Sequence, residues 1–262
     1  MDLDISGKTA LVTGSSKGLG RAVAEALVQE EVNVMLCARG VVALEQAADA
    51  IRALGGGKVE YEVADLTRAE DVARVTQSCV RKFGSVDILV TNAGGPSPGK
   101  FSEVGDEHWR QGIELVLMSV INLCRAAMPY MKKQKWGRII HITSLVVKQP
   151  IDGLAIPNAL RNAINGLAKT LALELAPSNI TVNSVGTGWT LTDRVNVLMQ
   201  AQARREGITM QEAIDRLERS IPLGRMGRPE ELASLVTFLA SKRASYITGS
   251  TFLVDGGAYA GL

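Results

Sequence analysis

The fold is decided by the stretch Thr9-Ala10-Leu11-Val12-Thr13-Gly14-Ser15-Ser16-Lys17-Gly18-Leu19-Gly20. Its first five residues form a short apolar run, which predicts a buried strand, and residues 21–27 have the spacing of an amphipathic helix. Glycines permit positive φ and close backbone approach, and the free amides of a helix N-terminus attract anions. A strand, a glycine-rich turn and a helix in this order predict a dinucleotide-binding protein, although the spacing is Gly-x-x-x-Gly-x-Gly rather than Gly-x-Gly-x-x-Gly.

Short apolar runs and amphipathic stretches alternate along the rest of the chain. Further strands are predicted at 32–37, 59–63, 86–90, 138–142, 180–185 and 251–254. Helices are predicted near 19–30, 41–54, 68–83, 103–134, 157–176 and 229–240, with another helical region at 194–220. This alternation implies an α/β fold, a doubly wound parallel sheet of about seven strands with helices on both faces. We expect a single domain over residues 1–262, with ligands outside the carboxyl ends of the strands.

Composition excludes several classes of partner. The chain has 262 residues, of which 46% are hydrophobic, and 29 basic and 27 acidic side chains give a net charge of +2. This balance predicts no binding to nucleic acid or to an anionic membrane. The basic cluster Lys132, Lys133, Lys135 and Arg138 is interpreted as the solvated end of a helix. No uninterrupted apolar stretch approaches membrane-spanning length, and the start of the chain has no signal-peptide pattern.

The cysteines indicate a reducing compartment. Cys37, Cys79 and Cys124 are far apart, lie in apolar stretches and have no metal-ligand spacing. Buried thiols in the cytoplasm and the absence of a metal site are therefore expected.

Further motifs follow the predicted strands. They are Asp65-Leu66, Asn92-Ala93-Gly94, Asn183-Ser184-Val185-Gly186-Thr187-Gly188 with Thr192, and Asp255-Gly256-Gly257. Together with the glycine spacing, they resemble the short-chain dehydrogenase/reductase family, which has a Rossmann-type fold, over residues 6 to 258. The family usually has Pro-Gly where this chain has Thr187-Gly188.

The resemblance implies a nicotinamide dinucleotide as cofactor. It implies that Asp65-Leu66 contacts the adenine and that the segment near Thr192 holds the nicotinamide carboxamide. The expected cofactor-binding residues are Thr13, Gly14, Ser15, Ser16, Lys17, Gly18, Leu19, Gly20, Arg39, Asp65, Leu66, Asn92, Ala93, Gly94 and Thr192.

The end of the second strand decides between the two nicotinamide cofactors. Enzymes that select NAD usually carry a carboxylate there, and this chain has Cys37-Ala38-Arg39. Arg39 and Lys17 would flank a 2′-phosphate, with Ser15 and Ser16 as hydroxyl donors. NADP(H) is therefore favoured over NAD(H), and the alternative is that both cations merely face solvent.

The family's chemistry uses a Ser, a Tyr, a Lys and an Asn, of which this chain keeps one. Ser144 matches the Ser that orients the substrate oxygen. The Tyr position, thirteen residues later, is Pro157, the Lys position is Arg161, and the Asn position is Val116. Proline has no ionisable proton, and arginine does not release one near neutral pH. Losing one positioned acid costs on the order of 10²–10⁴-fold in rate, so chemistry by the family mechanism should be impaired.

Other side chains could replace the missing acid. Lys148, four residues past Ser144, is the best candidate acid, and the expected catalytic set is Ser144, Arg161 and Lys148. The alternative is that Lys148 faces solvent. The remaining possibilities are a packed His141, an exposed His108, Asn158 beside Pro157, and Tyr130, Tyr246 and Tyr259 in other segments.

Three functional hypotheses remain. The first is an NADP(H)-dependent oxidoreductase acting on a small-molecule carbonyl or alcohol, in the manner of 3-oxoacyl thioester reductases or polyol dehydrogenases. The second is an inactive dinucleotide-binding sensor or partner subunit, and the third is isomerisation or elimination on the same scaffold. By resemblance we also expect a substrate-covering segment at about 189–228 and a homo-oligomer, tetramer or dimer, formed through the helices at 103–134 and 157–176.

Overall fold

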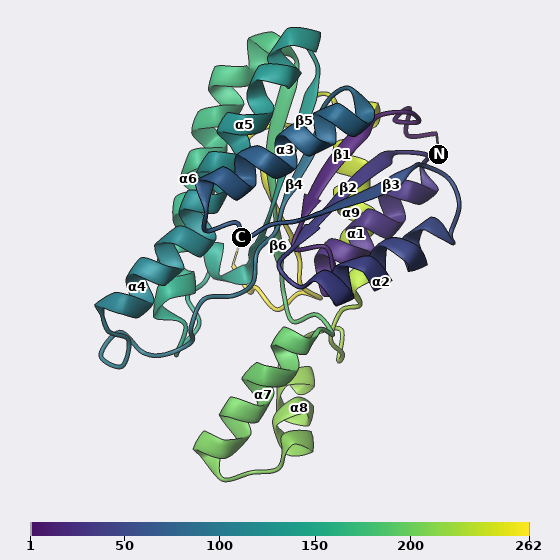
Figure 1. Ribbon diagram of the computed structural model, residues 1–262. Coiled ribbons are helices and arrows are strands. Elements are labelled where there is room, and N and C mark those ends of the chain that lie inside the picture. Colours follow the sequence, from purple (N-terminus) through teal and green to yellow (C-terminus); the bar gives the residue numbers. More distant parts are fainter. Residues whose placement is uncertain (1, 262) are drawn as a thin grey trace.

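A parallel seven-stranded sheet lies at the centre of the computed structural model, which describes residues 2–261 (Figure 1). Its strands are β1 (Thr9–Thr13), β2 (Asn33–Ala38), β3 (Val59–Val63), β4 (Ile88–Thr91), β5 (Gly137–Ser144), β6 (Ile180–Thr187) and β7 (Thr251–Val254). The strand order is β3-β2-β1-β4-β5-β6-β7, and every pairing is parallel. The order reverses between β1 and β4, which opens a crevice at their carboxyl ends. The predicted doubly wound sheet is confirmed.

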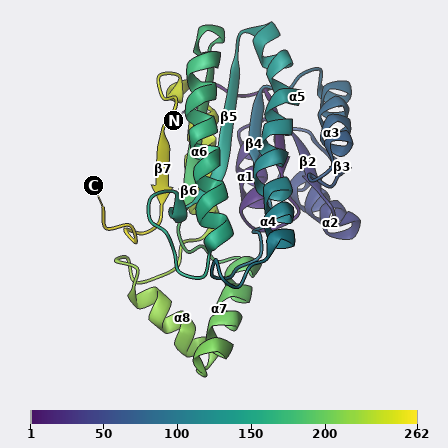
Figure 2. The same cartoon turned by 90° about the vertical axis from the view of Figure 1, so that its left-hand side faces the viewer.

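Helices cover both faces of this sheet (Figures 1 and 2). One face carries α1 (Gly18–Gln29), α2 (Val41–Arg52) and α9 (Pro229–Ala240). The other carries α3 (Ala69–Phe83), α4 (Asp106–Gly112), α5 (Ser119–Gln134) and α6 (Ala155–Leu175). The strands are apolar on both faces because each face packs against a layer of helices.

One long helix joins α4 to α5 through the π-helical segment Ile113–Met118. In the described part of the chain, this helix (Asp106–Gln134) alone is long and apolar enough to span a membrane, by length and composition only. Its apolar residues have partners within the fold, because Val120, Leu123 and Met131 are buried against the sheet and its neighbouring helices.

The predicted helical region 194–220 is two helices rather than one. Gly207 ends α7 (Asp193–Glu206) in a left-handed conformation at φ 65°. Thr209 then starts α8 (Met210–Arg219), because its hydroxyl accepts from the Glu212 N–H while the Glu212 carboxylate accepts from the Thr209 N–H. The two helices project from the sheet and pack around a small apolar cluster of their own (Figures 1 and 2).

The interpretation of Arg138 as a solvated residue is wrong. Arg138 lies in β5, where it is 1% exposed, and it donates hydrogen bonds to the carbonyls of Ser241, Gly137 and Asn179. Its guanidinium also lies 4.5 Å from the centre of the Trp136 ring. Burial lowers the pKa of Arg138 to about 10. Three carbonyls and a π-face compensate for the lost water.

The expected burial of the three cysteines is confirmed. Cys37, Cys79 and Cys124 are buried free thiols, and burial raises the pKa of each to about 12. They are packing groups rather than reactive ones.

Candidate active site

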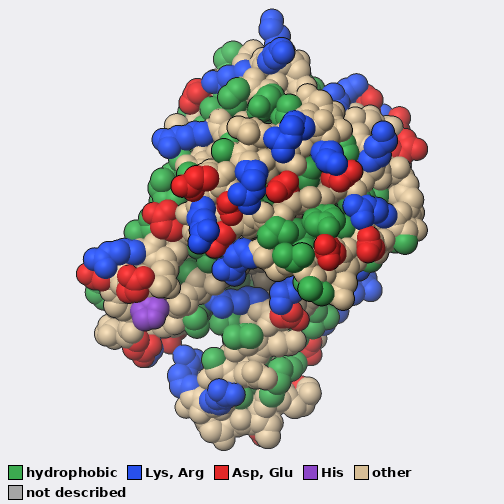
Figure 3. Space-filling model, viewed as in Figure 1, with side chains coloured by type: hydrophobic (Ala, Val, Ile, Leu, Met, Phe, Trp, Pro, Cys, Tyr) green, Lys and Arg blue, Asp and Glu red, His purple; other side chains and the backbone are tan. Residues whose placement is uncertain are grey.

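A cleft of about 920 Å³ lies at the carboxyl ends of the strands, between the sheet and the start of α7. Its size is within the range of small-molecule and cofactor pockets. The space-filling view shows it as a hollow above α7 and α8, bordered by basic side chains (Figure 3). Its basic lining residues are Lys17, Arg21, Arg39, Arg161 and Arg194.

The glycine-rich turn forms one end of the cleft and is held in place by Asn92. Gly14 and Gly18 both have a φ of 58°, which glycine adopts without strain. A Cβ at Gly14 would lie 2.8 Å from the Asn92 carbonyl oxygen, and one at Gly20 would overlap the carbonyl of Gly14. These positions therefore require glycine, so that the turn can approach the loop after β4.

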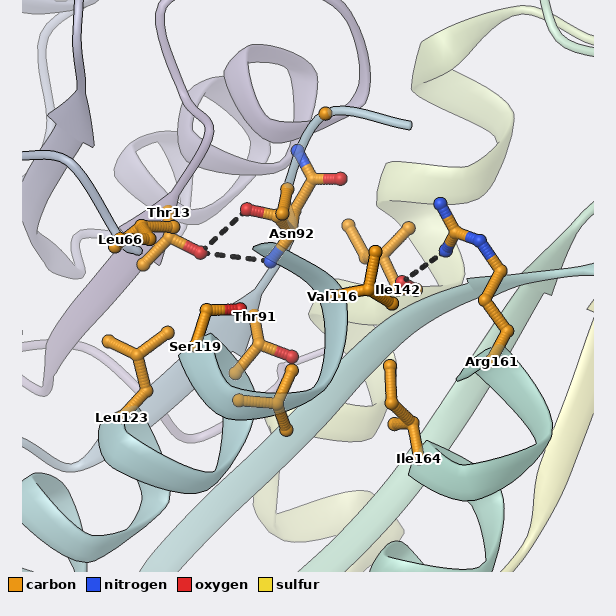
Figure 4. A pocket seen from close by; sticks show the side chains of 13 residues that line it. Thr13, Leu66, Thr91, Asn92, Val116, Ser119, Leu123, Ile142, Arg161 and Ile164 are labelled. Carbon is orange, nitrogen blue, oxygen red and sulfur yellow. Dashed lines mark hydrogen bonds between the residues drawn. The ribbon is translucent and has the colours of Figure 1, made fainter. Parts of the chain in front are cut away.

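Hydrogen bonds fix this approach (Figure 4). The Thr13 hydroxyl donates to the Asn92 carbonyl at 2.8 Å and accepts from the Asn92 N–H at 2.9 Å. The Asn92 side-chain amide donates to the Gly14 carbonyl at 3.2 Å. Thr13 is fully buried, so it supports the turn from below rather than touching the cleft.

The turn presents backbone amides to the cleft at the start of α1. Lys17 is the N-cap residue in extended conformation, and none of the described side chains caps the first turn. The N–H groups of Gly18, Leu19 and Gly20 are therefore available to an anion, and the helix dipole favours negative charge there. This is the geometry of a phosphate site.

The expected role of Ser15 is contradicted by the structure. Its hydroxyl is fully buried, donates to the Val12 carbonyl at 2.9 Å and accepts from the Cys37 N–H at 2.9 Å. Ser15 thus ties the turn to β2 and presents no donor to a phosphate. Ser16, the next hydroxyl, does line the cleft.

The cleft brings together most of the other expected cofactor residues. These are Gly14, Ser16, Lys17, Gly18, Leu19, Arg39, Asp65, Leu66, Asn92, Ala93, Gly94 and Thr192. Although burial alone would raise the pKa of Asp65, hydrogen bonds from the Thr67 N–H and hydroxyl, together with Arg39 and Arg68, hold it below its usual range. Asp65 is therefore an anion at neutral pH.

The two cations expected at a 2′-phosphate lie in different surroundings. Arg39 is exposed at the end of β2 and lines the cleft. Lys17 also lines the cleft, but its ammonium pairs with the Asp193 carboxylate at 2.6 Å. This pair joins the start of α1 to the start of α7 across the mouth of the cleft.

The catalytic end of the cleft holds Ser144, Pro157 and Arg161. Ser144 ends β5, and its hydroxyl accepts from the Val146 N–H at 3.4 Å. Pro157 is buried in the first turn of α6, where a missing N–H costs no helical hydrogen bond. Arg161, one turn later, donates to the Ile142 carbonyl at 3.3 Å (Figure 4). All three residues line the cleft.

Val116 lies in the π-helical segment, near Ile142 (Figure 4). It lines a cavity of about 10 Å³ together with Thr91, Asn92, Ser119 and Arg161. This is about the space of one water molecule. The Ser119 hydroxyl donates to the Leu115 carbonyl at 2.6 Å.

The structure does not bring Lys148 into this site. The turn at 145–147 carries Lys148 to the exposed surface, and it is not among the residues that line the cleft. The side chain of Asn158 is already hydrogen-bonded within the protein. Its amide N–H donates to the Ile151 carbonyl, and its amide oxygen accepts from the Ile151 N–H.

The histidines are placed as expected. His141 is fully buried, burial lowers its pKa to about 4, and its Nδ1 lies 2.8 Å from the Thr91 hydroxyl. His108 is exposed in α4. Among the described residues that line the cleft, there is no tyrosine or histidine.

Sequence reasoning missed Arg194. Its guanidinium donates to the Pro96 carbonyl at 2.8 Å and packs against Gly95, where a Cβ would lie 2.7 Å from the arginine Nε. The signal was an arginine two residues past Thr192, within the segment 189–228 that is expected to cover the substrate.

Comparison with known proteins extends over nearly the whole chain. A family model described as "Enoyl-(Acyl carrier protein) reductase" matches residues 14–259. The 3-oxoacyl-[acyl-carrier-protein] reductase of Escherichia coli (strain K12) is 38% identical, covering 98% of this chain and 99% of its own. The D-beta-hydroxybutyrate dehydrogenase of Rhizobium meliloti (strain 1021) is 36% identical, covering 95% and 98%. The L-sorbose reductase of Gluconobacter frateurii, solved with NADPH and L-sorbose, superimposes with a TM-score of 0.95 at 36% identity and full coverage of both chains.

Proposed function

Because the chain belongs to the short-chain dehydrogenase/reductase family, we propose that it is an NADP(H)-dependent oxidoreductase acting on a carbonyl or alcohol. The observation that carries the proposal is the phosphate turn, which Asn92 locks beside the cleft. The similar proteins are reductases and dehydrogenases, and the sorbose reductase was solved with NADPH.

The residues at the β2 end suit a 2′-phosphate. Arg39 is exposed at the cleft, and positions 38–40 carry no carboxylate to receive the ribose hydroxyls of NAD. The amides of Gly18, Leu19 and Gly20 would hold the pyrophosphate, and Asp65 with Leu66 would border the adenine. When bound, NADPH supplies a hydride for a carbonyl carbon.

Ser144 and Arg161 are the groups that would act on the substrate oxygen. The Ser144 hydroxyl would donate to that oxygen, and the Arg161 guanidinium would stabilise the negative charge that develops there. Burial, with a smaller contribution from Arg194, lowers the pKa of Arg161 only to about 10, so it remains a cation and releases no proton. In this proposal the proton comes from water, and the reaction is slower than one with a positioned acid.

A second candidate is a dinucleotide-binding protein without turnover, such as a sensor or a partner subunit. It is supported by Pro157, which lines the cleft at the position where the family resemblance implies a proton-donating Tyr. Binding of NADPH is common to both candidates.

The deciding experiment measures NADPH oxidation with a panel of ketones and 3-oxoacyl thioesters. We compare the wild type, Arg161→Lys, and the double variant Pro157→Tyr, Arg161→Lys, and titrate NADPH into each. We expect slow turnover by the wild type and an increase of about 100-fold or more in the double variant. Fast wild-type turnover would refute the atypical site, and no turnover by any variant that binds NADPH would favour the sensor.

Three further expectations also remain proposals. We propose that the segment 189–228 covers the substrate, which is supported by the cleft-lining Trp189, Leu191, Val195 and Leu198. We propose a homo-oligomer formed through α4–α5 and α6, where Leu173 is 73% exposed. The buried free thiols support a cytoplasmic location.

A further inference from the structure

Two guanidinium groups converge on the catalytic end of the cleft. Arg161 reaches it from α6, and Arg194 reaches it from the start of α7. Each makes one hydrogen bond to a backbone carbonyl, Ile142 for Arg161 and Pro96 for Arg194. Because a guanidinium has five N–H donors, most of the donors of both groups remain available to a ligand.

Neither guanidinium has a carboxylate partner among the described ion pairs of the protein. Burial lowers the pKa of both groups, and Arg194 contributes to the lowered pKa of Arg161. Two partly desolvated cations near one another are unfavourable unless an anion compensates them.

Arg138 shows how this fold treats a buried arginine that has only a structural role. Three backbone carbonyls and the Trp136 ring surround it. Arg161 and Arg194 have one carbonyl each and border an open cleft instead. Their surroundings are those of groups that meet a ligand.

We propose that Arg161 and Arg194 together bind an anionic group, a carboxylate or a phosphate, on the substrate. The proposal rests on the proposed function and narrows the substrate to a carbonyl compound or alcohol that carries an anion. Leu154, Trp189 and Leu198 line the same cleft and suit an apolar body attached to that anion. Arginine suits this role because its planar fork matches a carboxylate or phosphate.

The cofactor's own pyrophosphate is the other possible source of the anion. The turn at Gly18–Gly20 already offers that group a helix N-terminus. Arg194 instead contacts Gly95 and Pro96, in the loop that follows β4, and Arg161 lines the cleft together with Ser144 and Pro157. This placement favours the substrate over the cofactor.

The test measures binding as well as turnover. Acetoacetate and levulinate, their methyl esters, and inorganic phosphate are titrated by calorimetry into the full chain with and without saturating NADPH. The variants are Arg194→Gln, Arg194→Lys and the control Arg204→Gln, an exposed arginine on the same helix. Thermal unfolding of each variant verifies that it is folded.

We expect the keto acids to bind the wild type at least tenfold tighter than their esters. Arg194→Gln should remove this preference while the NADPH affinity changes less than threefold, Arg194→Lys should keep part of it, and Arg204→Gln should match the wild type. Equal binding of acid and ester by the wild type would overturn the proposal. So would a tenfold loss of NADPH affinity in Arg194→Gln with the acid preference intact, since the anion would then belong to the cofactor. If the keto acids bound more tightly than their esters but no turnover occurred, the proposed function would be wrong, and the proposed anion site would still be supported.

Discussion

Arg39 is the residue that we propose selects the cofactor. Its side chain is exposed at the end of β2, borders the cleft and has no ion pair among the described residues. Replacing it with a carboxylate would repel a 2′-phosphate and offer an acceptor to ribose hydroxyls. We expect Arg39→Asp to weaken NADPH binding tenfold or more and to leave NADH binding equal or tighter.

Fluorescence titrations with both nucleotides provide the measurement. The control is Arg81→Asp, which makes the same change at the exposed end of α3. An unchanged NADPH affinity in Arg39→Asp would show that Arg39 does not contact the phosphate.

His141 makes stability depend on pH. Burial lowers its pKa from 6.5 to about 4, and its Nε2 has no hydrogen-bond partner among the described residues. The unfolded chain therefore binds a proton below pH 6.5 that the folded chain does not bind until about pH 4. The free energy of unfolding should fall as the pH falls through this window, by roughly 3 kcal/mol in full.

Urea unfolding between pH 7 and pH 4.5 tests this prediction. His141→Asn, which keeps a polar group beside the Thr91 hydroxyl, should flatten the dependence. His108→Asn, at the exposed histidine, should leave it as in the wild type. If the free energy of unfolding of His141→Asn depended on pH as steeply as that of the wild type, another group would be responsible for the pH dependence.

Residue roles could be predicted where they depend on chemical identity and position along the chain. The expectation that Pro157 and Arg161 occupy the positions of a proton donor and its partner comes from the resemblance to the family, and it stays a prediction. The roles of Ser15 and Arg138 could not be predicted, because their partners come from distant segments, the backbone of Cys37 and the carbonyl of Ser241. Arg194 was missed for the same reason, since its contact at Pro96 lies 98 residues away.

At the scale of elements, α1 contains a glycine, Gly20, at a position where the low helix propensity of glycine would argue against it. Gly20 lies inside the helix, where alanine is normally preferred, but a Cβ there would overlap the carbonyl of Gly14. We expect Gly20→Ala to destabilise the protein by about 1–3 kcal/mol and to weaken dinucleotide binding. Gly166→Ala, in α6 and with open space around the added Cβ, should stabilise it by about 0.5–1 kcal/mol.

Urea unfolding and NADPH titration of the two variants provide the comparison. If both alanines had the same effect on stability, close packing of the turn against the helix would not be the reason for Gly20.

Element boundaries could be predicted well where short-range patterns set them. The strand ends agree with the structure within two residues, because apolar runs bounded by polar residues mark buried strands. The break in 194–220 was not predicted, although Gly207 and the pair Thr209–Glu212 carry its local signal. Apolar spacing that continues on both sides of the break made the two helices resemble one.

At the scale of the whole molecule, the pair Lys17–Asp193 links the sheet body to the α7–α8 projection. Both side chains are about 70% exposed, so the pair adds less than about 1 kcal/mol to global stability. We expect Asp193→Asn to leave global unfolding nearly unchanged but to speed hydrogen exchange in α7. The effect should shrink at high salt, because ions screen the pair in the wild type.

Hydrogen exchange followed by mass spectrometry provides the measurement. The control is Asp215→Asn on α8, whose carboxylate accepts only from Gln211 of the same helix. Equal exchange in Asp193→Asn and the wild type would show that the bridge does not restrain α7.

The hydrogen bonds between the glycine-rich turn and Asn92 have a consequence for the evolution of this chain. Its hydrogen bonds join Thr13, Gly14 and Asn92, and none involves Pro157, Arg161 or Val116. The hydrogen bonds that hold the proposed nucleotide-binding turn are thus independent of the side chains that would act on a substrate. Mutations can change the side chains that would act on a substrate without breaking the hydrogen bonds of the turn. The protein can therefore acquire new reactions while it continues to bind the nucleotide.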